Sequence, residues 1–335
     1  MSSTVAGDIE APVLRHGGLQ KTAVVAAKLI VTAACFWYVG RQIDFSRALS
    51  AIPSVDLRWL AIATVIAVVQ IPIAAIRWRQ ILFALKALSG HMTAWTLTTI
   101  TGIGVFFGQV LPSGASEGVR AWLLVHVDAS WRDALTSVVI DRVTGLMLLM
   151  VVGFAALVLP SALTALGGYR TWVLLAYAAV LIGSIAGLLS LPWLTPLLRR
   201  WRYTRWLANM LDALYVVVLG PQGPAILGLA FTIHLLTMAI VWALARGQGI
   251  TLPLADVLVL FSVMVGIVVL PISMGGWGLR ELAVISLLAP HGVAPETALL
   301  FSICFGLVLL AGSLPGAVIW LFYSPAPARA SEQRS

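Results

Sequence analysis

The sequence predicts an all-α protein that crosses a lipid bilayer several times. Of its 335 residues, 60% are hydrophobic and only 10% are charged, whereas soluble domains carry about 25% charged residues. Apolar runs of about 20 residues, the length of a membrane-spanning helix, recur along the chain. Arginine and lysine gather between these runs and account for the net charge of +8, as expected for the loops of a membrane protein.

We expect about six full spans. They cover residues 22–40, 59–76, 134–159, 171–191, 225–245 and 296–322. The first run ends in aromatic residues rather than in a signal-peptide cleavage site, so we interpret it as an uncleaved helix. Arg77, Trp78 and Arg79 follow the second run. We interpret them first as an anchor at the membrane surface and second as a contact to lipid headgroups.

Two further apolar segments, 94–111 and 253–271, end in proline and glycine and are followed by a charged, amphipathic stretch. The first runs into Leu111-Pro112-Ser113-Gly114, and the second into Leu270-Pro271-Ile272-Ser273-Met274-Gly275-Gly276. Proline and glycine interrupt helices, so we expect each segment to form a re-entrant or broken helical hairpin. The residues that shape the two breaks are Pro112, Gly114, Pro271 and Gly278.

Loop charge predicts the topology. The loop at 199–205 holds four arginines and should face the cytoplasm. If each hairpin enters and leaves the membrane on one side, four segments share the side of that loop and hold most of the basic residues: 1–21, 77–93, 192–224 and 323–335. The chain then divides into a cytoplasmic tail (1–21), a membrane domain (22–322) and a second cytoplasmic tail (323–335), with residues 41–58 outside.

The two hairpin segments resemble each other. Leu111-Pro112 leads to Gly118-Val119-Arg120, and Leu270-Pro271 leads to Gly278-Leu279-Arg280, at a nearly constant offset in the sequence. We interpret this as a duplication, with repeat units at about 94–159 and 253–322. An odd number of spans separates the units, so the repeat would be inverted, which points to a transport site at the membrane midplane. Chance matches in a leucine- and glycine-rich chain are the alternative.

Charged residues within this apolar domain need partners or a wet cavity, because a charge at bilayer depth costs about 2.5–3.5 kcal/mol. Glu117 and Arg120 lie three residues apart on one helical face. Arg280 and Glu281 are adjacent, so we expect them to point to different faces. Either Arg120 neutralises Glu117 and holds its hairpin closed, or the two arginines line a cavity.

Asp141-Arg142 lies inside an otherwise apolar span and is the pair that topology explains least. It either pairs with other helices or lines the same cavity. Arginine suits a phosphate group, because its planar guanidinium donates two hydrogen bonds at once. The serines and glycines beside the two prolines let backbone N–H groups approach an anionic headgroup. His234 is a lone histidine on an apolar helix, and we expect it to be a hydrogen-bonded core residue.

Several kinds of site have no sequence signal. The chain has neither a Walker sequence nor a GxGxxG after a strand. Spacing supports no metal-ligand cluster and no nucleophile with its base, and no basic stretch is long enough to form a nucleic-acid-binding domain. We therefore expect no catalytic residue, no metal, no cofactor, no nucleic-acid partner and no enzymatic activity. Movement of a substrate would be passive or coupled to an ion.

The motifs together resemble a known family. They are Gln109-Val110-Leu111-Pro112-Ser113-Gly114, Glu117-Gly118-Val119-Arg120, Asp141-Arg142 with Gly145-Leu146, and the run from Leu270 to Glu281. This pattern resembles the lysylphosphatidylglycerol synthase transmembrane-region family, the flippase-like domain of bacterial and archaeal membranes, over roughly residues 20–322. The first motif departs from the commoner Gly-Gly-Asp/Glu form, since Ala115-Ser116-Glu117 stands there.

The resemblance implies a lipid translocase of the bacterial cytoplasmic (inner) membrane, with both termini in the cytoplasm and without the soluble synthase domain of full-length members. Its expected partners are lipids with an anionic or phosphate-bearing headgroup; a homo-oligomer or a biosynthetic enzyme partner stays open. A small-solute secondary transporter and a membrane subunit of a lipid or glycan biosynthesis enzyme are the rival functions. The candidate substrate-binding residues are Arg120, Arg280, Glu117, Glu281, Asp141, Arg142, Gln109, Ser113, Ser273, Gly275 and Gly276.

Overall fold

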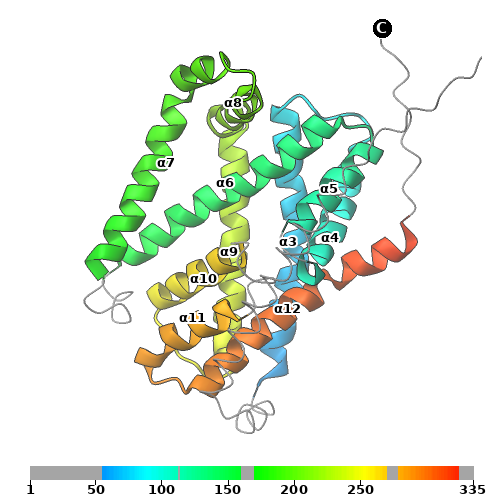
Figure 1. The fold of residues 1–335 in the computed structure, drawn as a ribbon. Helices are drawn as coiled ribbons and strands as arrows, with labels where there is room; N and C mark the ends of the chain where they lie inside the picture. Colours follow the sequence, from blue (N-terminus) through cyan, green and yellow to red (C-terminus); the bar gives the residue numbers. More distant parts are fainter. Residues whose placement is uncertain (1–54, 112–113, 160–169, 270–277, 324–335) are drawn as a thin grey trace, which may run out of the picture.

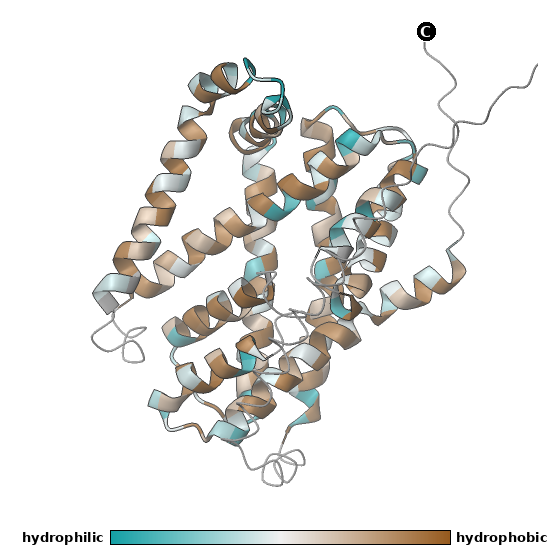
Figure 2. Ribbon diagram, viewed as in Figure 1, coloured by the Kyte–Doolittle hydropathy of each residue, from teal (hydrophilic) through white to brown (hydrophobic). Residues whose placement is uncertain are grey.

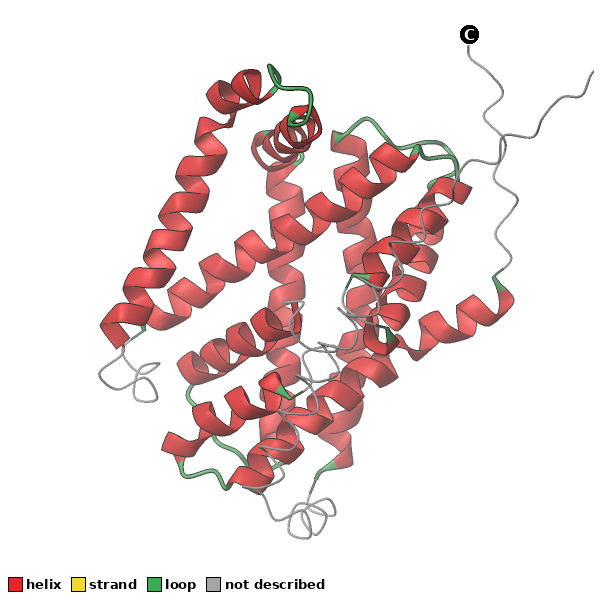
Figure 3. Cartoon of the chain, viewed as in Figure 1, coloured by secondary structure: helices red, strands yellow, loops and turns green. Residues whose placement is uncertain are grey.

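The structure, a computed structural model, describes residues 55–111, 114–159, 170–269 and 278–323, which form helices and no strand (Figures 1 and 3). Five helices are long and apolar enough to cross a membrane. They are α3 (Leu57–Ala84), α6 (Trp131–Val158), α7 (Arg170–Leu198), α9 (Gly223–Gly247) and α12 (Pro295–Phe322). These confirm the predicted spans from 59–76 onward; the span at 22–40 lies outside the described residues.

The second span is longer than predicted. Helix α3 continues without a break through Pro72 and through Arg77, Trp78 and Arg79. Trp78 is fully buried and Arg77 is mostly buried. The interpretation of Arg77 and Trp78 as an anchor at the membrane surface is therefore wrong. They lie in the protein interior, because partners on other helices bind them there.

Each predicted hairpin segment is a pair of helices. The first pair is α4 (Ala94–Val110) and α5 (Ala115–His126). The two are antiparallel: a Cβ on Gly108 would lie 3.1 Å from Ser116, and one on Gly104 would lie 2.4 Å from Arg120. The ends of α3, α5 and α6 share one hydrophobic core (Trp78, Leu124 and Ala134 among its members). The pair therefore returns the chain to the end of the molecule that it left.

The second pair is α10 (Leu254–Val269) and α11 (Leu279–Leu288), followed by a short 3-10 helix, Ala289–His291. A hydrogen bond between His291 Nε2 and Asp256 Oδ2, 3.0 Å long, joins the beginning of α10 to the end of the pair. A second core, which includes Phe261, Val284 and Phe301, packs this pair against α9 and α12. Both pairs thus consist of two helices in the predicted order, with a glycine immediately before the second helix.

Helix α12 crosses both halves of the molecule (Figure 1). Its contact with α4 is close: a Cβ on Gly316 would lie 2.0 Å from the carbonyl oxygen of Gly102. Only glycine permits this approach. By contrast, α7 packs mainly against α6 and the short helix α8 (Arg205–Leu219), with Leu174 and Tyr177 also near α10. Most of its surface is exposed and apolar (Figure 2), as expected for a helix that faces lipid.

Candidate functional site

Helix α6 carries a polar stripe along an apolar span. Asp133, Ser137, Asp141 and Thr144 follow one another at spacings of three and four residues, which places them on one face of the helix. All but Asp133 are buried. A buried carboxylate in such a span must find cationic or hydrogen-bonding partners, and the neighbouring helices supply them.

Asp141 is shared between two arginines. Its Oδ1 accepts a hydrogen bond from Nε of Arg77 on α3 at 2.9 Å and forms an ion pair with Nη2 of the same arginine, also at 2.9 Å. Its Oδ2 accepts one from Nη1 of Arg120 on α5, also at 2.9 Å. The exposed fraction is 11% for each arginine side chain and 4% for that of Asp141. The carboxylate of Asp141 on α6 thus links α6 to α3 and to α5 of the first helical pair.

Trp78 and Gly104 fix the position of Arg120. The guanidinium of Arg120 lies 4.2 Å from the centre of the Trp78 ring, a cation–π contact. The indole Nε1 of Trp78 in turn donates to Ser137 Oγ at 3.2 Å. On the other side, a Cβ on Gly104 would lie 2.4 Å from Cγ of Arg120. Glycine at this position leaves the space in which the arginine side chain runs.

This cluster has more positive than negative charge. Two guanidinium groups face one carboxylate, and Arg120 Nε and Nη2 are buried without a hydrogen-bond partner among the described residues. Buried donors of a charged group are costly to leave unpaired. The neighbouring ion pair, Arg142 with Glu117, adds no net charge. The arrangement can therefore accept one further anion whose oxygens match guanidinium geometry.

The second predicted arginine lies in a different kind of cluster. Arg280 donates from Nη2 and Nε to Oε1 of Glu281, at 2.7 Å and 3.2 Å. Its Nε also donates to Ser302 Oγ on α12 at 3.0 Å. Oε2 of Glu281 accepts the backbone N–H of Gly278 at 2.5 Å. With side-chain exposures of 2% and 0%, Arg280 and Glu281 form a buried, electrically neutral pair.

Two predicted pairings are corrected. Arg280 and Glu281 do not point to different faces; they bind each other, because Glu281 turns back toward the start of α11 and Arg280 follows it. Arg120 does not neutralise Glu117. Arg120 binds Asp141, whereas Glu117 binds Arg142 from the next helix, so the ion pairs join α5 to α6.

The remaining predicted residues lie at helix starts, in the core or outside the described part of the chain. Gly114 and Gly278, predicted to shape the breaks, immediately precede α5 and α11 with φ angles of 96° and 87°, a region that favours glycine. Gln109 is half-buried near the end of α4. His234 is a core residue as expected, with Nε2 3.0 Å from the Gly145 carbonyl oxygen. Outside the described residues lie Pro112, Ser113, Pro271, Ser273, Gly275 and Gly276.

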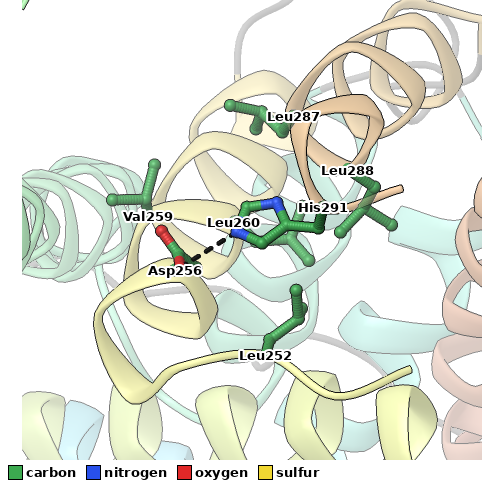
Figure 4. A pocket seen from close by; sticks show the side chains of 7 residues that line it. All are labelled: Leu252, Asp256, Val259, Leu260, Leu287, Leu288 and His291. Carbon is green, nitrogen blue, oxygen red and sulfur yellow. Dashed lines mark hydrogen bonds and ion pairs between the residues drawn. The ribbon is translucent and has the colours of Figure 1, made fainter. Parts of the chain in front are cut away.

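Two pairs were not predicted from the sequence: Arg77 with Asp141, and His291 with Asp256. Figure 4 shows the His291 ring pointing at Asp256 between the side chains of Leu252, Leu260 and Leu288. A cavity of about 10 Å³, the size of one water molecule, lies beside them. This pair joins the first turn of α10 to the residues that follow α11. In the sequence, the carboxylate of Asp141 within an apolar span was the signal that a cation such as Arg77 must lie near it in the fold.

Metal-ligand geometry does not occur in the described part of the chain: no three His, Cys, Asp or Glu side chains gather there as a metal site would require. The clusters above consist of cations with carboxylates. Their chemistry is the binding of anions and the neutralisation of charge inside a membrane domain.

Comparisons with known proteins place this architecture in a family. The family model described as the lysylphosphatidylglycerol synthase TM region matches residues 25–316. That range includes both helical pairs and every charged cluster described above. Searches of curated proteins and of solved structures gave no match. The chain is therefore a multi-pass membrane protein that belongs to the lysylphosphatidylglycerol synthase TM region family.

Proposed function

We propose that this protein is a lipid translocase, not an enzyme, which moves a phosphate-bearing headgroup across the bacterial cytoplasmic membrane past Arg77 and Arg120. The observation that carries the proposal is the excess cation of the Arg77–Arg120–Asp141 cluster. Two buried guanidinium groups share one carboxylate, and Arg120 keeps two donors without a partner among the described residues. A phosphate group supplies the missing negative charge and the missing acceptors.

Asp141 would act as the internal counter-ion of the empty site. Without a substrate, it neutralises part of the charge of the two arginines, which lowers the cost of keeping them within the membrane. When a phosphate binds, its oxygens replace part of this pairing. When it leaves, Asp141 restores it. Binding of the headgroup therefore neutralises the remaining positive charge, and Asp141 limits that charge when the site is empty, which favours transfer over permanent binding.

The architecture supports a lipid more than a soluble substrate. The acyl chains of a lipid can stay in the bilayer while the headgroup moves along polar side chains, and α6 presents such side chains along one face. The family matched by the chain is named for a lipid-synthesising enzyme's membrane region. The predicted topology, with both termini in the cytoplasm, is part of this proposal.

A translocation assay tests the proposal. The purified protein would be reconstituted with fluorescent phospholipids of several headgroups, and dithionite bleaching would report the fraction of lipid that reaches the outer leaflet. We expect wild type to remove the protected fraction and Arg120→Ala to leave it in place. Arg120→Lys should keep partial activity, because it retains the charge but loses the bidentate geometry.

Arg246→Ala is the matched control, because Arg246 is an exposed arginine on α9 that lies over the Trp242 ring and forms no ion pair with another described residue. It should behave as wild type. Equal bleaching curves for wild type, Arg120→Ala and empty vesicles, with every headgroup offered, would contradict the proposal and favour a solute transporter or an enzyme subunit.

A further inference from the structure

Helix α8 lies at the level where three spans end. Figure 1 shows it beside the ends of α3, α6 and α7, viewed nearly along its own axis, whereas α7 runs in the plane of the picture. Its apolar residues Ala213 and Leu214 pack against Ile81 of α3 and Ile140 of α6. Trp206, in the first turn of α8, is 66% exposed. An amphipathic helix at this level lies in the interface between hydrocarbon and water.

The turn that leads into α8 is basic and aromatic. Arg200 and Arg202 are exposed and make no ion pair within the described part of the chain, while Trp201 and Tyr203 are 70% and 90% exposed. Arg199 is tied to Asp212 of α8. Exposed arginines next to interfacial aromatics attract anionic headgroups, so the surroundings of α8 favour an anionic lipid leaflet.

A polar cavity of about 390 Å³ lies between α8 and the first turns of α6. This is the size of a small-molecule site. Its polar walls are Ser130, which caps α6, Arg132, Asp133 and Thr136 from α6, and Asn209 from α8. Ser130 donates to Asp133 at 2.7 Å. The side chains of Arg132, Thr136 and Asn209 have no hydrogen bond to any other described residue, so their donors are available to a ligand.

We propose that this cavity binds the headgroup of an anionic phospholipid from the leaflet that surrounds α8. Arg132 provides the cation for the phosphodiester, and Thr136 and Asn209 donate further hydrogen bonds to its oxygens. Asp133 accepts a hydroxyl or amine donor of the headgroup. The acyl chains lie along the exposed apolar side of α8. The occupant is a lipid and not a free phosphate ester, because the cavity opens at the level of the span ends beside an interfacial helix.

The cavity and the Arg77–Arg120–Asp141 cluster lie on the same helix. Thr136 and Asp141 are five positions apart on α6, about 7.5 Å along the helix axis. Arg132 is nine positions from Asp141, about 13.5 Å or two and a half turns, so a headgroup in the cavity lies about one and a half to two and a half turns along α6 from Asp141. The inference goes beyond the proposed function, since binding at equilibrium in this cavity requires no translocation.

Native mass spectrometry of the full-length protein in detergent tests the inference, with dioctanoyl phosphatidylglycerol as the lipid and glycerol 3-phosphate as the free ester. Arg132→Ala should weaken lipid binding about ten-fold, the effect of losing a charged hydrogen bond. Arg132→Lys should restore most of the binding. Asn209→Trp, which fills the cavity and keeps every charge, should also weaken it. Arg246→Ala, in the last turn of α9 and so at the end of that helix far from α8, is the control and should leave binding unchanged.

Thermal unfolding of each variant shows whether it is folded, so that loss of binding is separated from loss of structure. Wild-type affinity in both Arg132→Ala and Asn209→Trp would overturn the inference. An equal loss in Arg246→Ala would also overturn it, since the effect would then come from net charge alone. If glycerol 3-phosphate bound as tightly as the lipid, the assignment to a lipid headgroup would be wrong. None of these results depends on whether Arg120 supports translocation.

Discussion

The two helical pairs hold their arginines in opposite ways. Arg120 of the first pair reaches out to α6 and shares Asp141 with Arg77 of α3, so the cluster joins three helices and has an excess of positive charge. Arg280 of the second pair binds Glu281, its own neighbour, and is 2% exposed. This difference supports the proposal that the first cluster receives an anion and that the second stabilises the fold.

The register of the two helices explains this difference. Counted from the glycines that precede α5 and α11, Glu117 and Glu281 both occupy the third position. Arg120 lies at the sixth position of its helix and Arg280 at the second, one helical turn apart. Arg280 is therefore close enough to the start of α11 to bind the glutamate there, and Arg120 is placed to meet the neighbouring helices. The inverted repeat itself remains a prediction.

The largest effect should follow from breaking the neutral cluster. Arg280→Ala leaves the Glu281 carboxylate buried without its cation, which typically costs about 3–5 kcal/mol. We expect a large fall in the thermal unfolding temperature in detergent. The double variant Arg280→Met/Glu281→Gln removes both charges and should recover most of the loss. A single variant as stable as wild type would show that the pair is not structural.

The next largest effect tests the position of Arg120 in the first cluster. Gly104→Ala places a Cβ 2.4 Å from Cγ of Arg120 and should push the guanidinium away from Asp141. Overpacking of this kind costs about 1–3 kcal/mol, and we expect lipid translocation to fall more than stability does. Gly118→Ala on α5 is the control, because a Cβ there meets nothing within 4 Å. Equal translocation by both variants would contradict the position assigned to Arg120.

A smaller effect concerns the hydroxyl between the charges of the neutral cluster. Ser302 Oγ accepts from Arg280 and donates to Glu281 at 2.9 Å. Ser302→Ala removes both bonds but keeps the ion pair, so we expect a loss of about 1–3 kcal/mol in the free energy of unfolding. Urea unfolding in mixed micelles would measure it. A loss as large as that of Arg280→Ala would mean that the hydroxyl, and not the ion pair, holds this cluster.

The smallest effect belongs to the open end of the second pair. His291→Ala removes the hydrogen bond to Asp256, and we expect about 0.5–1.5 kcal/mol of destabilisation. Hydrogen exchange at the first turn of α10 should increase, while that of α4 and α5 should not change. His91→Ala, at an exposed position, is the matched control. Unchanged exchange at α10 would show that the pair does not hold this end closed.

Hydropathy predicted the spans from 59–76 onward, because lipid imposes long apolar helices. The two broken segments were predicted from proline and glycine, which interrupt such helices. The pairing of charges was not predictable in the same way. Asp141 binds Arg77, which lies 64 positions earlier in the chain, and no local pattern connects them. The adjacent Arg280 and Glu281 were misjudged because a glutamate at the third helical position can turn back to the cap N–H, which brings it to its neighbour.

The extent of α3 shows the same limit. Arg77-Trp78-Arg79 has the composition of a membrane-surface anchor, yet Trp78 is fully buried beneath Arg120. Tertiary partners decided the environment of these residues, and such partners become visible only when the helices are assembled. A carboxylate in an apolar span was the one sequence signal that required a buried cation.

The central claim is that the first cluster carries function and the second carries structure. Dithionite bleaching of reconstituted protein tests it with two variants that neutralise one cluster each: Arg77→Met/Arg120→Met/Asp141→Leu and Arg280→Met/Glu281→Gln. With rates normalised to folded protein, we predict that the first variant loses translocation and the second keeps most of it. Retained translocation in the first variant, with loss in the second, would contradict the account.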